Sequence, residues 1–212
     1  CMGTVWWQLN DCWPVTSWAV VDSRARRKPG WYALRDAYRP RLLTVQPRGG
    51  ALVVFAVNET ASPWHVRTDV VRGSITGEEL AGEPIELSVE PFSAAHHAIG
   101  SRVADPVDPR SEFLTVGEPD DRAWWWYAPD RAAPPPPAHL DVRARTDGNE
   151  GIVLTVTADT VVRALTIYPE RVRPTASIDR QLIDLLPDEP TEFRVKGVVL
   201  DDVAALTRAP AL

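Results

Sequence analysis

The pattern of hydrophobic and polar residues changes near residue 41, where short strand-like runs begin. Leu42–Val45 and Ala51–Val57 are joined by Pro47-Arg48-Gly49-Gly50, which is typical of a hairpin turn. Ile85–Glu90 alternates apolar and acidic residues, as a half-exposed antiparallel strand does. Further runs are Trp64–Val71, Phe113–Val116 and Ala123–Tyr127. This spacing of short strands and turns predicts a β-sandwich over residues 41–134.

A second strand-rich region follows a proline run, Pro134–Pro137, for which we expect a stiff polyproline II linker. Its strand-like runs are Leu140–Ala144, Ile152–Thr157, Val161–Tyr168 and Phe193–Val195. Ile178–Leu186 has a helical period, but Leu185–Glu189 favours a loop that enters the last strand. We therefore predict a second sandwich over residues 137–212.

Residues 1–40 have a different, aromatic-rich pattern. Val5–Leu9 predicts a short buried strand, and a helix is expected between Pro29 and Pro40. Its apolar stripe would be Trp31, Leu34 and Tyr38, widened by Ala33 and Ala37. A single βα unit cannot bury both of its faces, so we expect it to pack against another part of the protein.

Composition excludes several classes of protein. The chain has 212 residues, a net charge of −6 and 44% hydrophobic residues, enough to fill a core. No apolar run reaches the ~20 residues of a membrane span, and the acidic charge argues against nucleic-acid binding. The two cysteines, Cys1 and Cys12, provide neither a disulfide framework nor a zinc site, so no metal or cofactor is expected. Because the chain does not start with methionine, we expect it to begin inside a longer polypeptide.

The nine tryptophans are unevenly distributed, and the segment Trp7–Pro14 combines them with amides and a carboxylate. Flat rings stack on the C–H faces of sugars while Asn, Asp and Gln bind hydroxyls, so the segment is typical of a carbohydrate pocket. Trp7, Asp11 and Trp13 are the candidate substrate-binding residues, although an inter-domain core is an equal alternative for them. For Trp6 and Trp18 we favour the core.

Three other features have a structural explanation and a functional one. His96-His97 resembles a metal-binding pair, but neighbours on a strand point to opposite faces, so we expect no metal there. Asn58-Glu59-Thr60 matches a glycosylation acceptor, which has meaning only in a secreted protein. Trp124-Trp125-Trp126 is either a sugar-stacking platform or, as we favour, a packing strand between domains.

The segment Gly3–Trp18 closely resembles the signature of β-mannosidases of glycoside hydrolase family 2. Val21-Asp22-Ser23 and Lys28–Leu34 are similar to that family's final barrel segment, while Val57–Thr60 and Leu185–Glu189 resemble its C-terminal sandwiches. The run Arg24-Ala25-Arg26-Arg27 departs from the family pattern, which has Tyr-Gly-Arg-like residues there.

The resemblance implies a mainly β protein: two immunoglobulin-like sandwiches, residues 41–134 and 137–212, preceded by the last βα unit of a (β/α)8 barrel, residues 1–40. Enzymes of this family retain configuration with two glutamates about 5–5.5 Å apart. Both belong to earlier barrel strands, so the resemblance assigns no catalytic residue to this chain. It places Trp7 on the floor of the sugar subsite, with Trp7–Gln8 as a candidate cis peptide bond in the intact barrel, and gives Asp11 and Trp13 pocket positions.

The function implied is therefore that of the C-terminal part of a retaining β-mannosidase, which removes terminal non-reducing β-D-mannose and is inactive without its upstream glutamates. Its partners would be a β-mannoside oligosaccharide and the rest of the barrel, with no nucleic acid and no membrane. The alternatives are a non-catalytic carbohydrate-binding or interaction module and a related family 2 exo-glycosidase, such as an exo-glucosaminidase. Few lysines against many arginines suggest a bacterial source, and we expect a cytoplasmic location.

Overall fold

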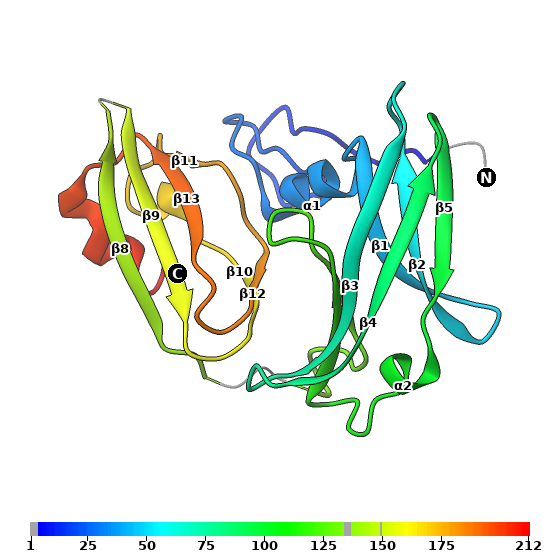
Figure 1. Cartoon of the computed structure of the whole chain (residues 1–212). Coiled ribbons are helices and arrows are strands. Elements are labelled where there is room, and N and C mark those ends of the chain that lie inside the picture. The colour runs from blue at the N-terminus through cyan, green and yellow to red at the C-terminus, as the bar shows by residue number, and fades with distance from the viewer. Residues whose placement is uncertain (1–3, 134–136, 149) are drawn as a thin grey trace. The chain divides into compact units, whose positions relative to one another are not determined.

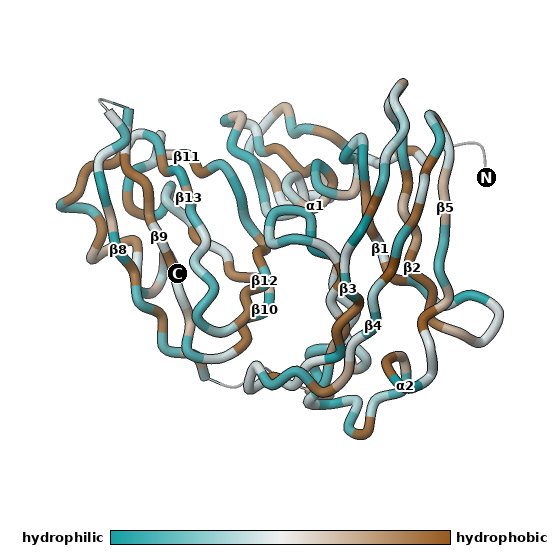
Figure 2. The backbone as a smooth tube through the Cα atoms, in the orientation of Figure 1, coloured by the Kyte–Doolittle hydropathy of each residue, from teal (hydrophilic) through white to brown (hydrophobic). Residues whose placement is uncertain are grey.

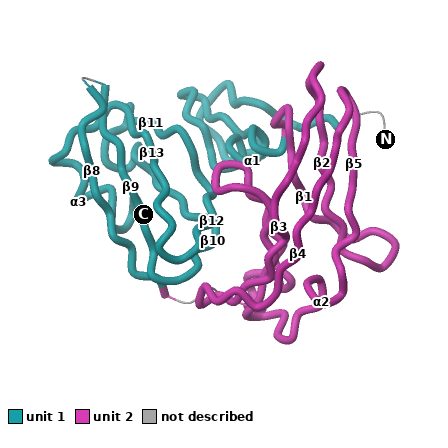
Figure 3. Tube along the Cα trace, in the orientation of Figure 1, with its two compact units in different colours: residues 1–37, 138–212 teal, residues 38–137 magenta. Residues whose placement is uncertain are grey.

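The computed structural model describes residues 4–133, 137–148 and 150–212. The chain forms two compact units, which Figure 3 distinguishes by colour: unit 1 combines residues 1–37 and 138–212, and unit 2 comprises residues 38–137. The domain limits expected from the sequence, at residues 40, 134 and 137, stay a prediction. Pro134 to Pro136 of the expected linker, and Gly3 of the N-terminal segment, lie outside the described residues.

Unit 2 is built from two antiparallel sheets (Figure 1). The three-stranded sheet has the order β1-β2-β5, with β1 at Arg41–Arg48, β2 at Ala51–Asn58 and β5 at Ser93–Ala98. The four-stranded sheet has the order β4-β3-β6-β7, with β3 at Trp64–Ser74, β4 at Glu79–Val89, β6 at Glu112–Val116 and β7 at Ala123–Trp126. A short helix, α2 (Ser101–Ala104), follows β5.

Local sequence explains these strands. Gly49 and Gly50 both have positive φ, 61° and 85°, which is the geometry of the tight turn that joins β1 to β2. Along β4 the apolar residues Ile85, Leu87 and Val89 are buried, and the residues between them are exposed. One core takes buried side chains from both sheets, so residues of unit 2 form the predicted sandwich.

The strand β5 has no run of branched apolar residues, and the sequence pattern did not reveal it as part of the sandwich. It is held by pairing with β2, with Val54 opposite His97 and Asn58 opposite Ser93. Tertiary pairing thus determines the conformation of this segment, since its own residues have little strand preference.

The buried polar residues of unit 2 include Asn58 and the two members of an ion pair. The side chain of Asn58 is fully buried, and its Nδ2 donates to the carbonyls of Ser62 (2.9 Å), Val89 (3.3 Å) and Glu90 (3.1 Å). Its Oδ1 accepts from the backbone N–H of Thr60 at 3.1 Å. In the folded chain Asn58 is therefore a structural residue that holds the loop after β2, and its amide is not accessible to a glycan.

The buried ion pair is between Arg72 on β3 and Glu112 on β6. Glu112 also accepts hydrogen bonds from the backbone N–H groups of Val107 (3.1 Å) and Asp108 (2.8 Å). The pair thus ties the loop between α2 and β6 to the four-stranded sheet.

Unit 1 contains a smaller sandwich (Figure 1). Its four-stranded sheet has the order β11-β13-β9-β8, with β8 at Leu140–Asp147, β9 at Gly151–Ala158, β11 at Ser177–Ile178 and β13 at Thr191–Lys196. Two short strands, β10 (Val162–Leu165) and β12 (Ile183–Leu185), pair separately. The helical segments are α1 (Pro29–Ala37), η1 (Pro169–Arg171), η2 (Leu200–Asp202) and α3 (Val203–Leu206).

The core of unit 1 lies between these sheets. Leu154 and Phe193 from the larger sheet are fully buried, as is Leu185 from β12, at 2% exposure. Figure 2 shows the hydrophobic stretch along β9. The two predicted immunoglobulin-like sandwiches are confirmed as the main architecture of the chain.

Two predictions for this unit need correction. Val161–Tyr168 is not one strand: β10 ends at Leu165, and Ala164 has a φ of 55°, which breaks the register with β12. The loop expected at Leu185–Glu189 begins only after Leu185, because Ile183–Leu185 form β12. Both errors come from local backbone irregularities that side-chain periodicity does not encode.

The helix α1 begins at Pro29 as predicted, but its buried face differs from the expected one. Tyr32 is 2% exposed and belongs to the core of unit 1, whereas Tyr38 is 61% exposed. The Tyr32 hydroxyl donates to the carbonyl of Ile178 at 2.8 Å, and Arg35 Nη1 donates to the carbonyl of Asp179 at 2.6 Å. Burial raises the pKa of Tyr32 above its usual value. The helix is therefore attached to the C-terminal sandwich through the strand β11.

We expect Tyr32→Phe to lower the free energy of unfolding by about 1–3 kcal/mol, because it leaves the buried carbonyl of Ile178 without a donor. Urea unfolding followed by circular dichroism measures the difference. Tyr38→Phe is the matched control, since the Tyr38 side chain is exposed. Equal effects of the two substitutions would contradict this role for Tyr32.

Candidate functional site

The segment from residue 4 to residue 28 is an irregular, hydrogen-bonded loop. Its turns are joined by a parallel bridge between Asn10 and Val21 and an antiparallel bridge between Val21 and Arg27. The backbone N–H of Val21 donates to the carbonyl of Leu9 at 2.9 Å, and that of Asp11 donates to the carbonyl of Val21 at 3.0 Å.

The prediction of a buried strand at Val5–Leu9 is wrong for this structure. The segment has no strand conformation, and Val5 is 92% exposed and Leu9 63% exposed. A strand needs a neighbour to satisfy its backbone groups, and no strand among the described residues pairs with Val5–Leu9. The apolar sequence therefore remains on the surface.

Asp11 is the centre of the loop. Its side chain is 3% exposed; Oδ1 accepts from the Ser17 hydroxyl at 2.6 Å, and Oδ2 pairs with Lys28 Nζ at 3.3 Å. Both carboxylate oxygens are thus used to hold the two ends of the loop together. The predicted contact of Asp11 with a sugar stays a prediction, and in this conformation it requires one of these partners to move.

Trp7 and Trp13 lie on the surface, 72% and 66% exposed. The Trp7–Gln8 peptide bond is cis in this chain, while the cis bond expected in the intact barrel stays a prediction. Both indoles are available for stacking, but the described residues do not enclose them in a pocket with Asp11. Their predicted role in substrate binding stays a prediction.

The inter-domain core favoured for Trp6 and Trp18 stays a prediction. Trp6 is 49% and Trp18 73% exposed. With Trp7, Trp13 and the apolar residues Val5, Leu9 and Val15, they make the N-terminal loop an unusually apolar surface. Exposed apolar area of this kind is typical of a binding surface.

A tight turn follows the aromatic loop. Asp22 Oδ1 accepts from the backbone N–H groups of Arg24 and Arg26, each at 2.9 Å, and Oδ2 accepts from Arg26 Nε at 2.6 Å. Desolvation acts to raise the pKa of Asp22, but the hydrogen bonds from Arg26 and Arg24 outweigh it, and the pKa lies below its ordinary value of 3.8.

This lowered pKa predicts a pH-dependent stability of the turn. Because the carboxylate is favoured in the folded chain, its contribution is present above pH 3.8 and is lost as the pH falls through the folded-state pKa. Asp22→Asn is therefore expected to lower the free energy of unfolding at pH 6 more than at pH 3. Arg26→Gln removes the charged partner of Asp22, so it should also lower the free energy of unfolding more at pH 6 than at pH 3. An effect of Asp22→Asn that does not change with pH would refute the assignment.

The described residues hold no cluster of three or more His, Cys, Asp or Glu side chains that could bind a metal ion. His96 stacks on Phe55 with ring centroids 5.7 Å apart, and His97 Nε2 lies 3.2 Å from Glu83 Oε1. The thiol of Cys12 is free and exposed. Within the described chain, none of the helices is long and apolar enough to cross a membrane.

The aromatic strand β7 has two faces. Trp124 and Trp126 are stacked, with centroids 5.4 Å apart and planes 4° apart, and both contact Phe113. Trp125 packs against the core of unit 2. The alternation expected for a strand is present, while the choice between a sugar platform and an inter-domain packing strand stays open to experiment.

Comparison with solved structures defines the class of fold. The β-D-mannosidase from Dictyoglomus thermophilum matches 94% of this chain with a TM-score of 0.77 and 23% identity, over 25% of its own length. The exo-chitosanase of Amycolatopsis orientalis matches 90% of the chain with a TM-score of 0.57 and 14% identity, over 27% of its length. The chain therefore has the fold of part of these larger glycosidases.

Curated relatives make the resemblance more particular. β-Mannosidase B from Emericella nidulans is 48% identical over 46 residues, 22% of this chain and 6% of the relative. β-Mannosidase B from Aspergillus niger is 52% identical over 40 residues, 19% of this chain and 5% of the relative. No family model matches the chain. These comparisons confirm the resemblance to the C-terminal portion of a family 2 β-mannosidase, of which the chain spans only a part.

Sequence reasoning missed a cavity in unit 1. The basic run Arg24–Arg27 and the buried residue Gln181 line the same cavity. The basic run is visible in the sequence, but its neighbour lies about 155 residues away along the chain, so no local pattern connects the two.

Proposed function

We propose that this chain is the C-terminal part of a retaining β-mannosidase, whose parent enzyme hydrolyses terminal non-reducing β-D-mannose residues. The observation that carries the proposal is the 48–52% identity to β-mannosidase B sequences over 40 to 46 residues. The shared fold over most of the chain supports it.

In this proposal the exposed aromatic loop forms one wall of the sugar pocket. Trp7 and Trp13 would stack on the mannose ring, and Asp11 would hold the loop that carries them or accept a sugar hydroxyl. The apolar exposure of Val5, Trp6 and Leu9 fits burial against the rest of a catalytic barrel. The two catalytic glutamates belong to that barrel, so the chain by itself would not hydrolyse a glycoside.

The experiment compares the 212-residue chain with a longer protein that includes its upstream coding sequence. The longer protein is expected to turn over 4-nitrophenyl β-D-mannopyranoside, and the 212-residue chain is expected not to. Turnover by the 212-residue chain above that of its Trp7→Ala variant would refute the assignment of both catalytic glutamates to the upstream region.

A related family 2 exo-glycosidase is the second candidate, because an exo-β-D-glucosaminidase matches 92% of the chain with a TM-score of 0.61. The same longer protein should be assayed on 4-nitrophenyl β-D-glucosaminide. A higher kcat/KM on this substrate than on the mannoside would replace the first proposal by the second.

The stacked pair Trp124 and Trp126 favours a third candidate, a carbohydrate-binding module. Calorimetric titration of the 212-residue chain with mannobiose tests it. Binding that is lost in Trp124→Ala and kept in Trp7→Ala would support the module; loss in Trp7→Ala alone would support the pocket. Trp125→Ala reports on the core, against which that ring packs.

A bacterial source and a cytoplasmic location are part of the proposal. The arginine-rich composition supports the first. The curated relatives named above are fungal, so they do not support it.

A further inference from the structure

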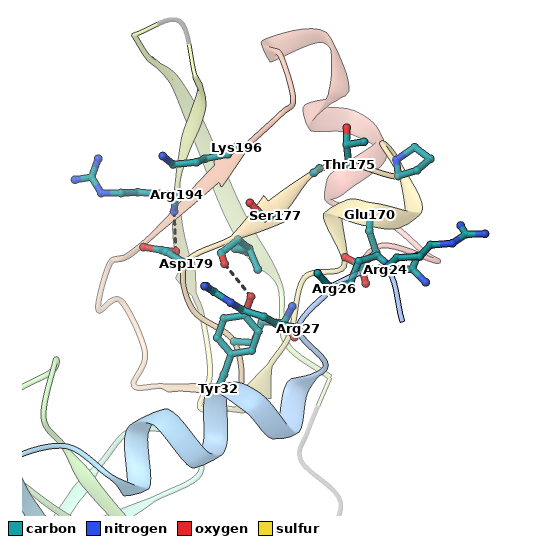
Figure 4. Close-up of a pocket in the computed structure, with 15 residues that line it drawn as sticks. Arg24, Arg26, Arg27, Tyr32, Glu170, Thr175, Ser177, Asp179, Arg194 and Lys196 are labelled. Carbon is teal, nitrogen blue, oxygen red and sulfur yellow. Dashed lines mark hydrogen bonds between the residues drawn. The ribbon is translucent and has the colours of Figure 1, made fainter. Parts of the chain in front are cut away.

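Unit 1 contains a cavity of about 830 Å³ on the side of the sandwich that carries α1 and β11. Figure 4 shows that its walls come from the basic run after Asp22, from α1, from the segment between η1 and β12, and from β13. This volume falls within the range of about 300–1,000 Å³ typical of small-molecule sites. The cavity is lined by none of the residues predicted to bind mannose, Trp7, Asp11 and Trp13.

The walls of this cavity are basic, although the chain as a whole carries a net charge of −6. Five cationic side chains line it against two carboxylates: Arg24, Arg26, Arg27, Arg194 and Lys196 against Glu170 and Asp179. A concave surface with an excess of one sign of charge concentrates the field and attracts the opposite charge.

Two of the cations have no carboxylate partner. Arg26 is paired with Asp22, Arg194 with Asp147 and Lys196 with Glu150. Arg24 and Arg27 form no ion pair with any of the described residues. The Arg27 guanidinium is instead held over the Trp31 ring, 4.0 Å from its centroid, which fixes its position without neutralising its charge.

A buried acceptor in the same wall also has no partner. Gln181 is 2% exposed and donates from Nε2 to the carbonyl of Ile167 at 3.0 Å. Its Oε1 receives no hydrogen bond from the described residues. A buried amide oxygen without a donor is destabilising, so a hydroxyl that reaches this oxygen would be favoured.

We propose that this cavity binds a small anionic sugar, either a sugar acid or a sugar phosphate. Its oxyanion would pair with the guanidinium group of Arg27, whose planar fork matches carboxylate and phosphate oxygens, and Arg24 in the same lining would add to the attraction of the anion. A sugar hydroxyl would donate to Gln181 Oε1, and the hydroxyls of Thr175 and Ser177 lie in the same lining. The binding expected at this cavity does not depend on the proposed glycosidase activity.

Calorimetric titration of the 212-residue chain with D-glucuronate and with mannose 6-phosphate, at matched ionic strength, tests the proposal. At least one of the two anions is expected to bind with a millimolar or lower Kd, and neutral mannose at least tenfold more weakly at this cavity. The anion that binds with the lower Kd shows whether the cavity takes a sugar carboxylate or a sugar phosphate. Absence of binding by both anions, or equal binding of neutral mannose, would overturn the proposal.

The double variant Arg24→Gln, Arg27→Gln is expected to weaken anion binding at least tenfold. Arg143→Gln is the matched control, because Arg143 lies on β8 of the same unit, is 83% exposed and does not line the cavity. Equal losses in the two variants would show non-specific attraction and reject the site. Circular dichroism checks the fold of the double variant. In the unchanged chain, NMR amide chemical-shift changes at Thr175, Ser177 and Gln181 on adding the anion give a second measurement of binding. The absence of these changes also rejects the site.

Discussion

Glu112→Ala is expected to lower the free energy of unfolding of unit 2 by about 3–5 kcal/mol. The carboxylate is 6% exposed and is the ion-pair partner of Arg72, which is itself 8% exposed. Removing one partner leaves the other charge buried without compensation, which is far more costly than losing an exposed pair. The loop that contains Val107 and Asp108 also loses the acceptor of its two N–H groups. Urea unfolding gives the difference.

A matched control exists in the same sheet. Glu86 pairs with Arg67 between β3 and β4, and these side chains are 70% and 82% exposed. Glu86→Ala is expected to change the free energy of unfolding by less than about 1 kcal/mol. The double variant Arg72→Met, Glu112→Leu should recover much of the loss, because it removes both charges. A loss for Glu112→Ala no greater than that for Glu86→Ala would contradict the structural role of the pair.

Trp7→Ala is expected to lower kcat/KM on a β-mannoside by about ten- to a hundredfold in the longer protein, while leaving the stability of the 212-residue chain nearly unchanged. This expectation rests on the proposed function. Loss of a stacked indole removes about 1.5–3 kcal/mol of the free energy that apolar contact with the sugar provides. Since Trp7 is 72% exposed in the chain, its removal leaves no cavity.

Trp18→Ala is the matched control, because Trp18 is 73% exposed on the same loop. Its effect on kcat/KM should be less than about threefold if only Trp7 touches the sugar. An equal loss in both variants would indicate that the aromatic loop acts as a packing surface, without a specific sugar contact at Trp7.

The strands with strong alternation or branched residues could be predicted from the sequence, and most of them are present. β2, β4 and β9 are examples, since their own residues determine which face is buried. β5 could not be predicted in the same way, because its conformation depends on pairing with β2. The buried side of α1 was predicted only in part: Trp31 packs against the core of unit 1 as expected. Tyr32 was missed, because it is held by the carbonyl of Ile178, a partner 146 residues away.

The candidate site shows a similar division. The composition of Trp7–Pro14 indicated sugar chemistry, and the cis bond after Trp7 agrees with the family resemblance. The two hydrogen-bond partners of Asp11 were not predictable, because Ser17 and Lys28 approach it only through the turns of the loop. The exposure of Trp18 within this chain was not predictable, because a sequence pattern shows which residues are apolar and not what covers them.

The division of unit 1 into two separate stretches has a consequence for biosynthesis. Residues 38–137 form their own core and can fold as soon as they leave the ribosome. The helix α1 is synthesised earlier, but the Tyr32 ring can be buried and its hydroxyl can form its hydrogen bond only after Ile178 has been synthesised. During that interval the ring of Tyr32 is exposed to other nascent chains. Closing the loop of about a hundred residues adds an entropic cost that grows slowly with its length. Translation order therefore makes the N-terminal segment, although it is synthesised before the two sandwiches, one of the last parts of this chain to reach its final environment.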